Sequence, residues 1–362
     1  MPARDDLRPL YLNTQGLTVG KSSLVLRVKE RDKVVQEVRI QELCQVNLFG
    51  GIQITTQAIQ ALCEQEVPIA YFSQGGWFYG ITHGLGVRNV ELRLRQFQQA
   101  AHPATCLRVA RALIAGKIRN QRTLLQRNHV EPPANALALM KQFAADAERA
   151  ESLESLLGIE GNGARIYFEH LSGMIKVNAA GEDLDGGGGG ATGGEPLKRP
   201  LSTDTMPFDF TKRNRRPPRD PVNAMLSLAY SLLAKDLTIV CHAVGFDPYL
   251  GFLHQPRFGR AALAVDLMEP FRPLIADSAV LTAINTRMVT PGDFVRAGDA
   301  VNLTAAGRRS FFRAYEQRMD ALVTHPLFGY RVSYRRLLEV QTRLLARFIA
   351  GEMSDYPVFV TR

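Results

Sequence analysis

The sequence predicts an α+β protein, in which a small N-terminal β domain with one helix precedes a larger, all-helical domain. Over residues 10–79, apolar and polar residues alternate and β-branched types are frequent, which is typical of short, half-buried strands. After Gly84 and Gly86 the apolar residues recur at helical spacing instead. We therefore expect a β-rich domain over residues 1–85 and a helical domain over residues 86–362, and the 46% hydrophobic content can fill a sizeable core.

The N-terminal domain is predicted to contain short strands separated by turn-forming Gly, Asp and Asn residues, together with a single helix at residues 55–65. The strands are expected at residues 10–13, 23–28, 34–40, 45–48, 69–72 and 77–79.

In the second domain the helical spacing predicts helices and no strand before the C-terminal tail. The helices are expected at residues 87–100, 103–127, 135–149, 153–175, 221–241, 261–275, 304–322 and 334–351. Asp220 followed by Pro221 is a helix start signal, and Thr304 can cap the helix that follows it. Residues 181–200 are rich in glycine and almost free of apolar side chains, so this insertion is expected to be a flexible surface loop.

Composition argues against several classes of protein. The four cysteines, Cys44, Cys63, Cys106 and Cys241, form no CxxC pair, which argues against zinc sites, iron–sulfur sites and a disulfide framework. No apolar run reaches the length of a membrane span, and the N-terminus does not resemble a signal peptide. We therefore expect a cytoplasmic protein without a membrane partner.

The net charge of +9 makes a polyanion a plausible partner, and the excess is concentrated. Between residues 88 and 127 there are nine Lys or Arg residues and one acid. Arg108, Arg111, Arg119 and Arg122 share one helical face beside an apolar stripe, which favours binding of a phosphate backbone over an ordinary solvated face.

A second basic cluster immediately precedes the helix that begins at Pro221, and helix N-termini favour anions. It contains Lys212, Arg213, Arg215, Arg216 and Arg219. The cluster indicates a phosphate contact, and the alternative is a mobile basic loop.

Glu160 is an acid within the apolar stripe of a predicted helix, where a carboxylate is costly unless a cation or hydrogen-bond donors meet it. Gly161 and Gly163 leave room for a ligand to approach. The alternative is a Glu at the margin of the core that reaches solvent or pairs with Arg165.

His254 is followed by a helix that holds Asp266 and Glu269 on one face. One His with two or three carboxylates suits Mg²⁺ or Mn²⁺, although a lone His is more often a satisfied core residue. Spacing alone neither brings Glu160 to His254 nor decides between Asp266 and Glu269.

Four ordered motifs carry a resemblance to a known family. The segments LLGIEGNGARIYF, RRPPRDPVNAMLSLAYSLL, DPYLGFLH and VDLMEPFRP resemble the CRISPR-associated integrase and endonuclease family, the first of the Cas proteins, Cas one. The match covers essentially the whole chain and includes GKIRNQRTLL at residues 116–125. The opening RDDLRPLYLNTQG resembles the junction of fusions with an iron–sulfur exonuclease, Cas four.

The resemblance implies that the N-terminal domain helps to form a homodimer and that the helical domain is catalytic. It implies an Mg²⁺ or Mn²⁺ site with Glu160, His254 and Glu269 as ligands, and Asp266 beside them in the catalytic group. Many relatives have Asp where this chain has Glu269, which affects the ligand geometry more than the function. The residues expected to contact DNA are Arg108, Arg111, Lys117, Arg119, Arg122, Arg165, Arg216, Asn223 and Arg257.

The implied function is insertion of prespacer DNA into the leader-repeat region of a CRISPR array, by attack of a DNA 3′-hydroxyl on a phosphodiester. Cas two, and Cas four, are the implied protein partners. Two alternatives stay open: a general metal-dependent nuclease that acts on branched DNA, and a non-catalytic DNA-binding scaffold.

Overall fold

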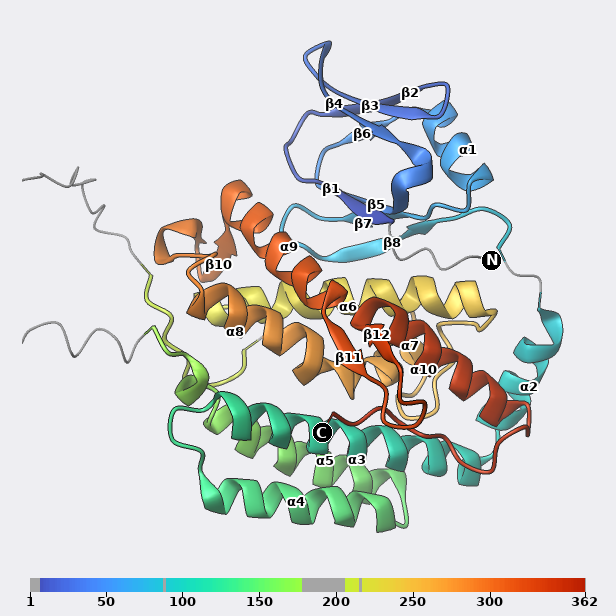
Figure 1. The fold of residues 1–362 in the computed structure, drawn as a ribbon, viewed down its shortest axis with the longest axis vertical. Helices are drawn as coiled ribbons and strands as arrows, with labels where there is room; N and C mark the ends of the chain where they lie inside the picture. The colour runs from blue at the N-terminus through green and yellow to red at the C-terminus, as the bar shows by residue number, and fades with distance from the viewer. Residues whose placement is uncertain (1–6, 87–88, 178–205, 215–216, 362) are drawn as a thin grey trace, which may run out of the picture.

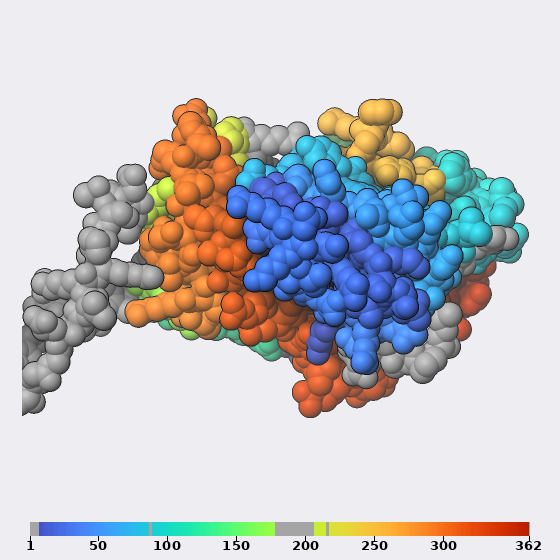
Figure 2. Space-filling model, turned by 90° about the horizontal axis from the view of Figure 1, so that it is seen from above, coloured from blue at the N-terminus to red at the C-terminus, as the bar shows by residue number. Residues whose placement is uncertain are grey.

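The computed structural model describes residues 7–86, 89–177, 206–214 and 217–361. The predicted Gly-rich loop at 181–200 and the predicted DNA contact Arg216 lie outside the described residues. A β-rich N-terminal domain rests on a mostly helical domain (Figure 1). Seen from above, the N-terminal domain covers the centre of the molecule, and helical-domain elements extend on both sides (Figure 2).

The N-terminal domain consists of two four-stranded sheets and one helix. One sheet has the order β1-β5-β7-β8, in which β1, β5 and β7 are parallel, and the other has the order β4-β3-β2-β6. The strands are β1 Arg8–Leu12, β2 Thr18–Ser22, β3 Val25–Glu30, β4 Lys33–Arg39, β5 Leu43–Phe49, β6 Gln53–Ile54, β7 Ile69–Phe72 and β8 Phe78–Thr82. A short 3-10 turn, η1 Ile40–Glu42, precedes β5, and Thr55 caps helix α1 Thr56–Glu64.

The six predicted strands are present, and two further strands were not predicted. Strand β2 contains Gly20, Lys21 and Ser22, which are typical of a turn, and β6 has only two residues. These strands form because neighbouring strands pair with them, which a local pattern cannot show.

The helical domain is built around two long helices, α3 Pro103–Asn128 and α6 Pro221–Val244. In Figure 1, α6 runs beneath strand β8, and α3, α4 and α5 form the layer farthest from the sheets. The remaining helices are α2 Val90–Ala100, α4 Ala134–Arg149, α5 Leu153–Glu169, α7 Ala262–Met268, α8 Ser278–Asn285, α9 Ala305–Asp320 and α10 Tyr334–Ile349. Short 3-10 turns lie at η2 Ser172–Met174 and η5 Pro291–Asp293.

The prediction that this domain lacks strands was wrong. Two antiparallel hairpins interrupt it, one formed by β9 Phe294–Ala297 and β10 Ala300–Leu303, the other by β11 Leu322–Thr324 and β12 Arg331–Ser333. Strands of three or four residues are too short to display a period of two, so the sequence pattern did not distinguish them from helices and loops.

The helix predicted at 261–275 is also divided. Helix α7 ends at Met268, and a π-helical turn, η4 Arg272–Asp277, leads into α8. Pro270 and Pro273 lack the N–H groups that would continue a regular helix here. Wide turns of this kind are frequent at functional sites.

The prediction that no apolar run reaches the length of a membrane span was wrong for helix α6, which is long and apolar enough by composition to cross a membrane. It is the central helix of the protein core, and most of its residues are buried against neighbouring elements. Packing within the domain therefore explains why α6 is so apolar.

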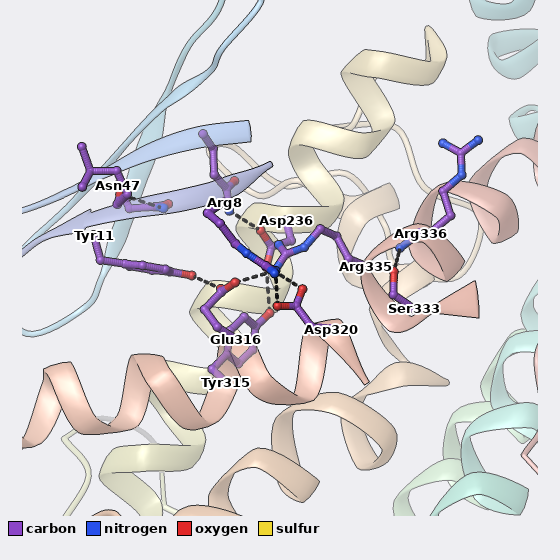
Figure 3. Close-up of polar contacts among 12 residues, drawn as sticks. Arg8, Tyr11, Asn47, Asp236, Tyr315, Glu316, Asp320, Ser333, Arg335 and Arg336 are labelled. Atoms are coloured by element: carbon purple, nitrogen blue, oxygen red, sulfur yellow. Dashed lines mark hydrogen bonds and ion pairs between the residues drawn. The ribbon is translucent and has the colours of Figure 1, made fainter. Parts of the chain in front are cut away.

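A partly buried polar cluster joins the two domains (Figure 3). Arg335 of α10 forms ion pairs with Glu316 and, at 3.3 Å, with Asp320, both of α9. From strand β1, the Tyr11 hydroxyl donates to Glu316 at 2.6 Å, and Arg8 bonds Asp320 at 2.5 Å. Burial raises the pKa of Glu316, and Arg335 opposes that rise.

Helix α6 takes part in the same interface. The buried carboxylate of Asp236 accepts hydrogen bonds from Tyr315 of α9 at 2.8 Å and from Gln45 of β5 at 3.1 Å. The neighbouring Lys235, also buried, donates to it at 2.5 Å. The placement of the sheets on the helices is therefore fixed by directional contacts as well as by apolar packing.

Candidate metal and DNA site

Glu160 lies in α5, which begins after the cap residue Ser152. Its side chain is 26% exposed and its carboxylate forms an ion pair with Lys117 of α3, whereas Arg165 pairs with Glu169. The alternative pairing of Glu160 with Arg165 was therefore wrong. A Cβ on Gly161 would meet nothing within 4 Å, whereas one on Gly163 would lie 3.3 Å from Ile118, so only Gly161 leaves open space.

Glu269 directly follows α7, and its carboxylate is buried between two cations. Lys117 Nζ lies 2.7 Å from Oε2, and Arg272 Nη2 lies 3.0 Å from Oε1. Burial alone would raise the pKa of Glu269, but Arg272 and Lys117 together lower it to about 2. Lys117 therefore links the two acids that were predicted to be metal ligands.

Arg272 was missed by the sequence analysis, although it lies three residues after Glu269 in the DLMEPFRP motif. Its guanidinium stacks on the Tyr230 ring, 4.9 Å from the centroid. The Tyr230 and Tyr167 hydroxyls donate to the two oxygens of Asp277 at 2.7 and 2.8 Å. Burial raises the pKa of Asp277 to about 6, although these hydrogen bonds and Arg272 oppose the rise.

Asp266 is fully buried and tied to the segment before α7. It accepts hydrogen bonds from the backbone N–H groups of Phe252, Leu253 and His254 at 2.6–2.9 Å. Its Oδ1 also lies 2.6 Å from His254 Nδ1. Because a carboxylate oxygen accepts hydrogen bonds, the ring donates from Nδ1, and in the neutral imidazole Nε2 then has a lone pair for another partner.

Two residues outside the predicted site shape the segment that carries His254. A Cβ on Gly251 would lie 2.6 Å from Asp266 Oδ2, so only glycine permits this close approach. Gln96 of α2 donates to the carbonyls of Asp247 and Leu250 at 2.8 and 2.7 Å. Gln96 is a polar residue at a buried position of the amphipathic helix α2, and this departure from the apolar pattern was the signal in the sequence for its contact with the His254 segment.

The C-terminal tail fixes the other side of Glu269. Asn120 of α3 donates to the carbonyls of Pro270 and Phe359 at 2.9 and 3.0 Å. Gly116, one turn earlier, lies against the tail so closely that a Cβ would come within 2.6 Å of a Val358 methyl group. The GKIRNQ motif therefore brings α3, the tail and the turn after α7 together.

The donor set suits a hard divalent cation, because it offers carboxylate oxygens and an imidazole nitrogen. Glu269 Oε2 has a charge contact with Lys117 but no directed hydrogen bond, so it can accept another partner. Within the described parts of the chain, however, no three His, Cys, Asp or Glu side chains are close enough together to hold a metal ion. The chemistry fits the predicted metal, and Lys117 lies between the two carboxylates.

The arginine face of α3, predicted to bind a phosphate backbone, is partly covered by neighbouring elements. Arg111 donates to the Ala150 carbonyl at 2.6 Å, Arg122 donates to the Leu137 carbonyl at 3.0 Å, and Arg119 pairs with Glu148 at 2.7 Å. Arg108 is exposed, bonds the Ser354 carbonyl and stacks on Phe348. These arginines therefore join α3 to α4 and to the C-terminal tail, and their contact with DNA stays a prediction.

The remaining predicted DNA contacts differ in their surroundings. Arg165 and Arg257 are exposed, whereas Lys117 is buried in the acid cluster. Asn223 is buried, accepts from Arg213 at 2.6 Å and donates to the Lys212 carbonyl at 2.9 Å. Asn223 therefore holds Lys212 and Arg213 against the start of α6, where Asp220 caps the helix as predicted.

The sequence model of the family described as CRISPR associated protein Cas1 matches residues 10–317. The chain belongs to the Cas1 family. A CRISPR-associated exonuclease Cas4/endonuclease Cas1 fusion from Geobacter sulfurreducens is 47% identical, over 100% of this chain and 62% of the fusion. A CRISPR-associated endonuclease Cas1 from Thermus thermophilus is 34% identical, over 97% of this chain and 95% of the relative.

The chain spans about three fifths of the length of the Cas4/Cas1 fusions from Geobacter sulfurreducens and Rhodospirillum rubrum, 62% and 59% respectively. Solved Cas1 relatives share the fold. A CAS1 protein from Thermotoga maritima superposes with a TM-score of 0.75 at 21% identity, over 98% of this chain and 100% of that protein. A casposase bound to its integration product gives a TM-score of 0.77 at 20% identity, over 97% and 93% of the two chains. These likenesses confirm the predicted fold class, a β-rich domain followed by a mostly helical one.

Proposed function

We propose that this protein is a divalent-metal-dependent DNA integrase of CRISPR adaptation. The observation that supports it is the grouping of Glu160, Lys117 and Glu269, with His254 held by Asp266, three residues before Glu269. In a member of the Cas1 family, such a charged and partly buried group is a candidate for phosphodiester chemistry.

In the proposed reaction, a prespacer 3′-hydroxyl oxygen forms a bond to a phosphorus atom of the CRISPR repeat, and one existing P–O bond breaks. One phosphodiester replaces another, so no external energy source is required. Mg²⁺ or Mn²⁺, when bound, would neutralise charge on the phosphate and stabilise the leaving oxygen.

The protein side chains would divide the remaining work. Glu160, His254 and Glu269 would hold the cation, and Asp266 would orient His254 through its Nδ1 proton. Arg272 keeps Glu269 ionised and in place. The predicted Lys and Arg contacts would position the DNA backbones without reading their sequence.

The partners follow from the relatives. Several of them, including those from Geobacter sulfurreducens and Rhodospirillum rubrum, are Cas4/Cas1 fusions. One solved relative is a Cas6-RT-Cas1–Cas2 complex, in which 98% of this chain and 36% of that chain align at 24% identity with a TM-score of 0.75. We therefore propose that the protein acts with Cas2 and with a Cas4 exonuclease, as a homodimer assembled through its β-rich domain, in the cytoplasm.

The deciding experiment combines the purified chain, Cas2, a plasmid that carries a leader and repeat, and a labelled DNA fragment. Joined products should form in Mn²⁺ with a free 3′-hydroxyl and should disappear with a 3′-dideoxy end. Cleavage of branched DNA without joining would instead favour the general nuclease. DNA binding that chelation leaves unchanged, with no product in any metal, would favour the scaffold.

A further inference from the structure

Lys117 occupies the space between the two carboxylates that are expected to bind metal. Its side chain is 5% exposed, and its Nζ contacts Glu160 from α5 and, at 2.7 Å, Glu269 after α7. Buried ammonium groups are costly unless they are paired, so this arrangement reflects the need of two neighbouring acids for a counter-ion.

The two cations at Glu269 differ in how firmly they are held. Arg272 is fixed by its stacking on Tyr230 and by its ion pair to Oε1. Lys117 donates a hydrogen bond to Glu160, but its contact with Glu269 Oε2 is a charge contact without a directed hydrogen bond. A lysine ammonium is a point charge on a flexible four-carbon stem, so it can move while its backbone stays in place. Lys117 is therefore the cation that a competitor can replace.

We propose that Lys117 and the divalent cation are alternative occupants of the same pair of carboxylates. Lys117 balances the charge of Glu160 and Glu269 before metal binds, and its ammonium moves away from them when metal binds. Together, a divalent cation and the ammonium would bring three positive charges to two carboxylates that Arg272 already neutralises in part. The partly exposed side of Glu160 gives the metal access. This inference rests on the metal site of the proposed function.

The first test is Mn²⁺ binding by Lys117→Met, measured by electron paramagnetic resonance without DNA. Because the competing charge is gone, we expect binding to tighten by about tenfold or more. The same variant should melt at a lower temperature in a chelator and gain more from Mn²⁺ than the wild type does. A merely structural lysine would give weaker or unchanged metal binding, and that result would overturn the proposal.

Lys235→Met is the matched control, because Lys235 is also buried and is paired with Asp236 in the domain interface. It should lower the melting temperature without changing the affinity for Mn²⁺. An equal increase in affinity in this control would show that loss of any buried lysine has the same effect, which contradicts a specific competition at Lys117.

A second measurement uses the unmodified protein and therefore does not depend on the folding of a variant. Acylation of lysine amines, followed by mass spectrometry, should label Lys117 several-fold faster in saturating Mg²⁺ than in a chelator. Lys235 provides an internal reference whose rate should not change. Slower or unchanged labelling of Lys117 in Mg²⁺ would overturn the proposal.

The outcomes for the two hypotheses can be separated. Wild-type protein that binds no Mn²⁺ would contradict the metal site of the proposed function, and the competition with it. Wild-type binding together with unchanged affinity in Lys117→Met would contradict only the competition. Strand transfer in the joining assay is measured independently of both results.

Discussion

Glu269 and Asp266 lie three residues apart, but their contacts give them different roles. Asp266 is saturated by three backbone N–H groups and His254, whereas Glu269 faces Lys117 and Arg272. We expect Glu269→Gln to lose Mn²⁺ binding and strand transfer together. Asp266→Asn should keep metal binding that is weaker by roughly 10- to 100-fold, because it only misorients a ligand. A Mn²⁺ titration of each folded variant checks this, and the opposite order would reverse the assignment.

Gly251 makes room for the Asp266 carboxylate, since a Cβ would approach Oδ2 to 2.6 Å. We expect Gly251→Ala to displace the His254 segment, lowering stability by about 1–3 kcal/mol and weakening Mn²⁺ binding. Gly158→Ala is the control, because a Cβ there meets nothing within 4 Å in α5 and alanine favours helix. Equal melting temperatures and metal affinities for the two variants would contradict the prediction.

The pKa of Asp277 is about 6 in the folded protein, above its ordinary value of 3.8. The folded state therefore binds this proton more tightly than the unfolded state, so stability should fall as pH rises from 3.8 to about 6. Asp277→Asn cannot titrate and should lack this component. Urea unfolding of both proteins at several pH values across this window measures the difference. Parallel stability profiles would show that Asp277 does not titrate there.

Helix α3 joins the catalytic candidates to a set of arginines whose DNA contacts are still predictions. Substituting Arg119 and Arg122 together by alanine should reduce the salt dependence of DNA binding by roughly 0.9 in slope for each phosphate that is no longer neutralised. Arg27→Ala is the control, because Arg27 pairs with Glu37 in the other domain. A salt slope equal to that of the wild type would contradict a role in DNA binding. Some decrease in stability is also expected, since Arg119 pairs with Glu148 of α4 and Arg122 donates to the Leu137 carbonyl of the same helix.

Elements with strong local signals could be predicted from the sequence, and those that depend on partners could not. Helix α6 begins at Pro221 after the Asp220 cap, as the sequence indicates. The spacing of α3 predicted an apolar stripe beside a free basic face, but backbone carbonyls of α4, of the residue after it and of the tail cover much of that face. Periodicity records which side chains are apolar and does not record what covers the charged ones.

The same limit applies to the candidate site. The family motifs indicated Glu160, His254 and Glu269 as metal ligands, whereas Lys117 was expected to contact DNA. Its position between two acids depends on how α3 packs against α5 and α7, which no local segment specifies. Arg272, by contrast, was missed although it lies three residues after Glu269, a spacing at which helical side chains meet.

The interface between the domains depends on Arg335, which neutralises Glu316 in largely buried surroundings. We expect Arg335→Met to cost about 1–3 kcal/mol, because it leaves a partly buried carboxylate with a hydrogen bond from Tyr11 but without its cation. Adding Glu316→Gln should recover much of this stability, since the remaining group is then neutral. Urea unfolding of the single and double variants checks both statements, and additive effects would show that the pair is not coupled.

Close contact between Gly116 and Val358 has an evolutionary consequence. The methyl group of Val358 occupies the space that a side chain at position 116 would need, so the two positions share one fixed volume. Among relatives that keep the tail beside the turn after α7, a larger residue at 116 should therefore coincide with a smaller one at 358. The residue types tolerated at position 358 would then depend on position 116 of α3, more than two hundred residues earlier in the sequence.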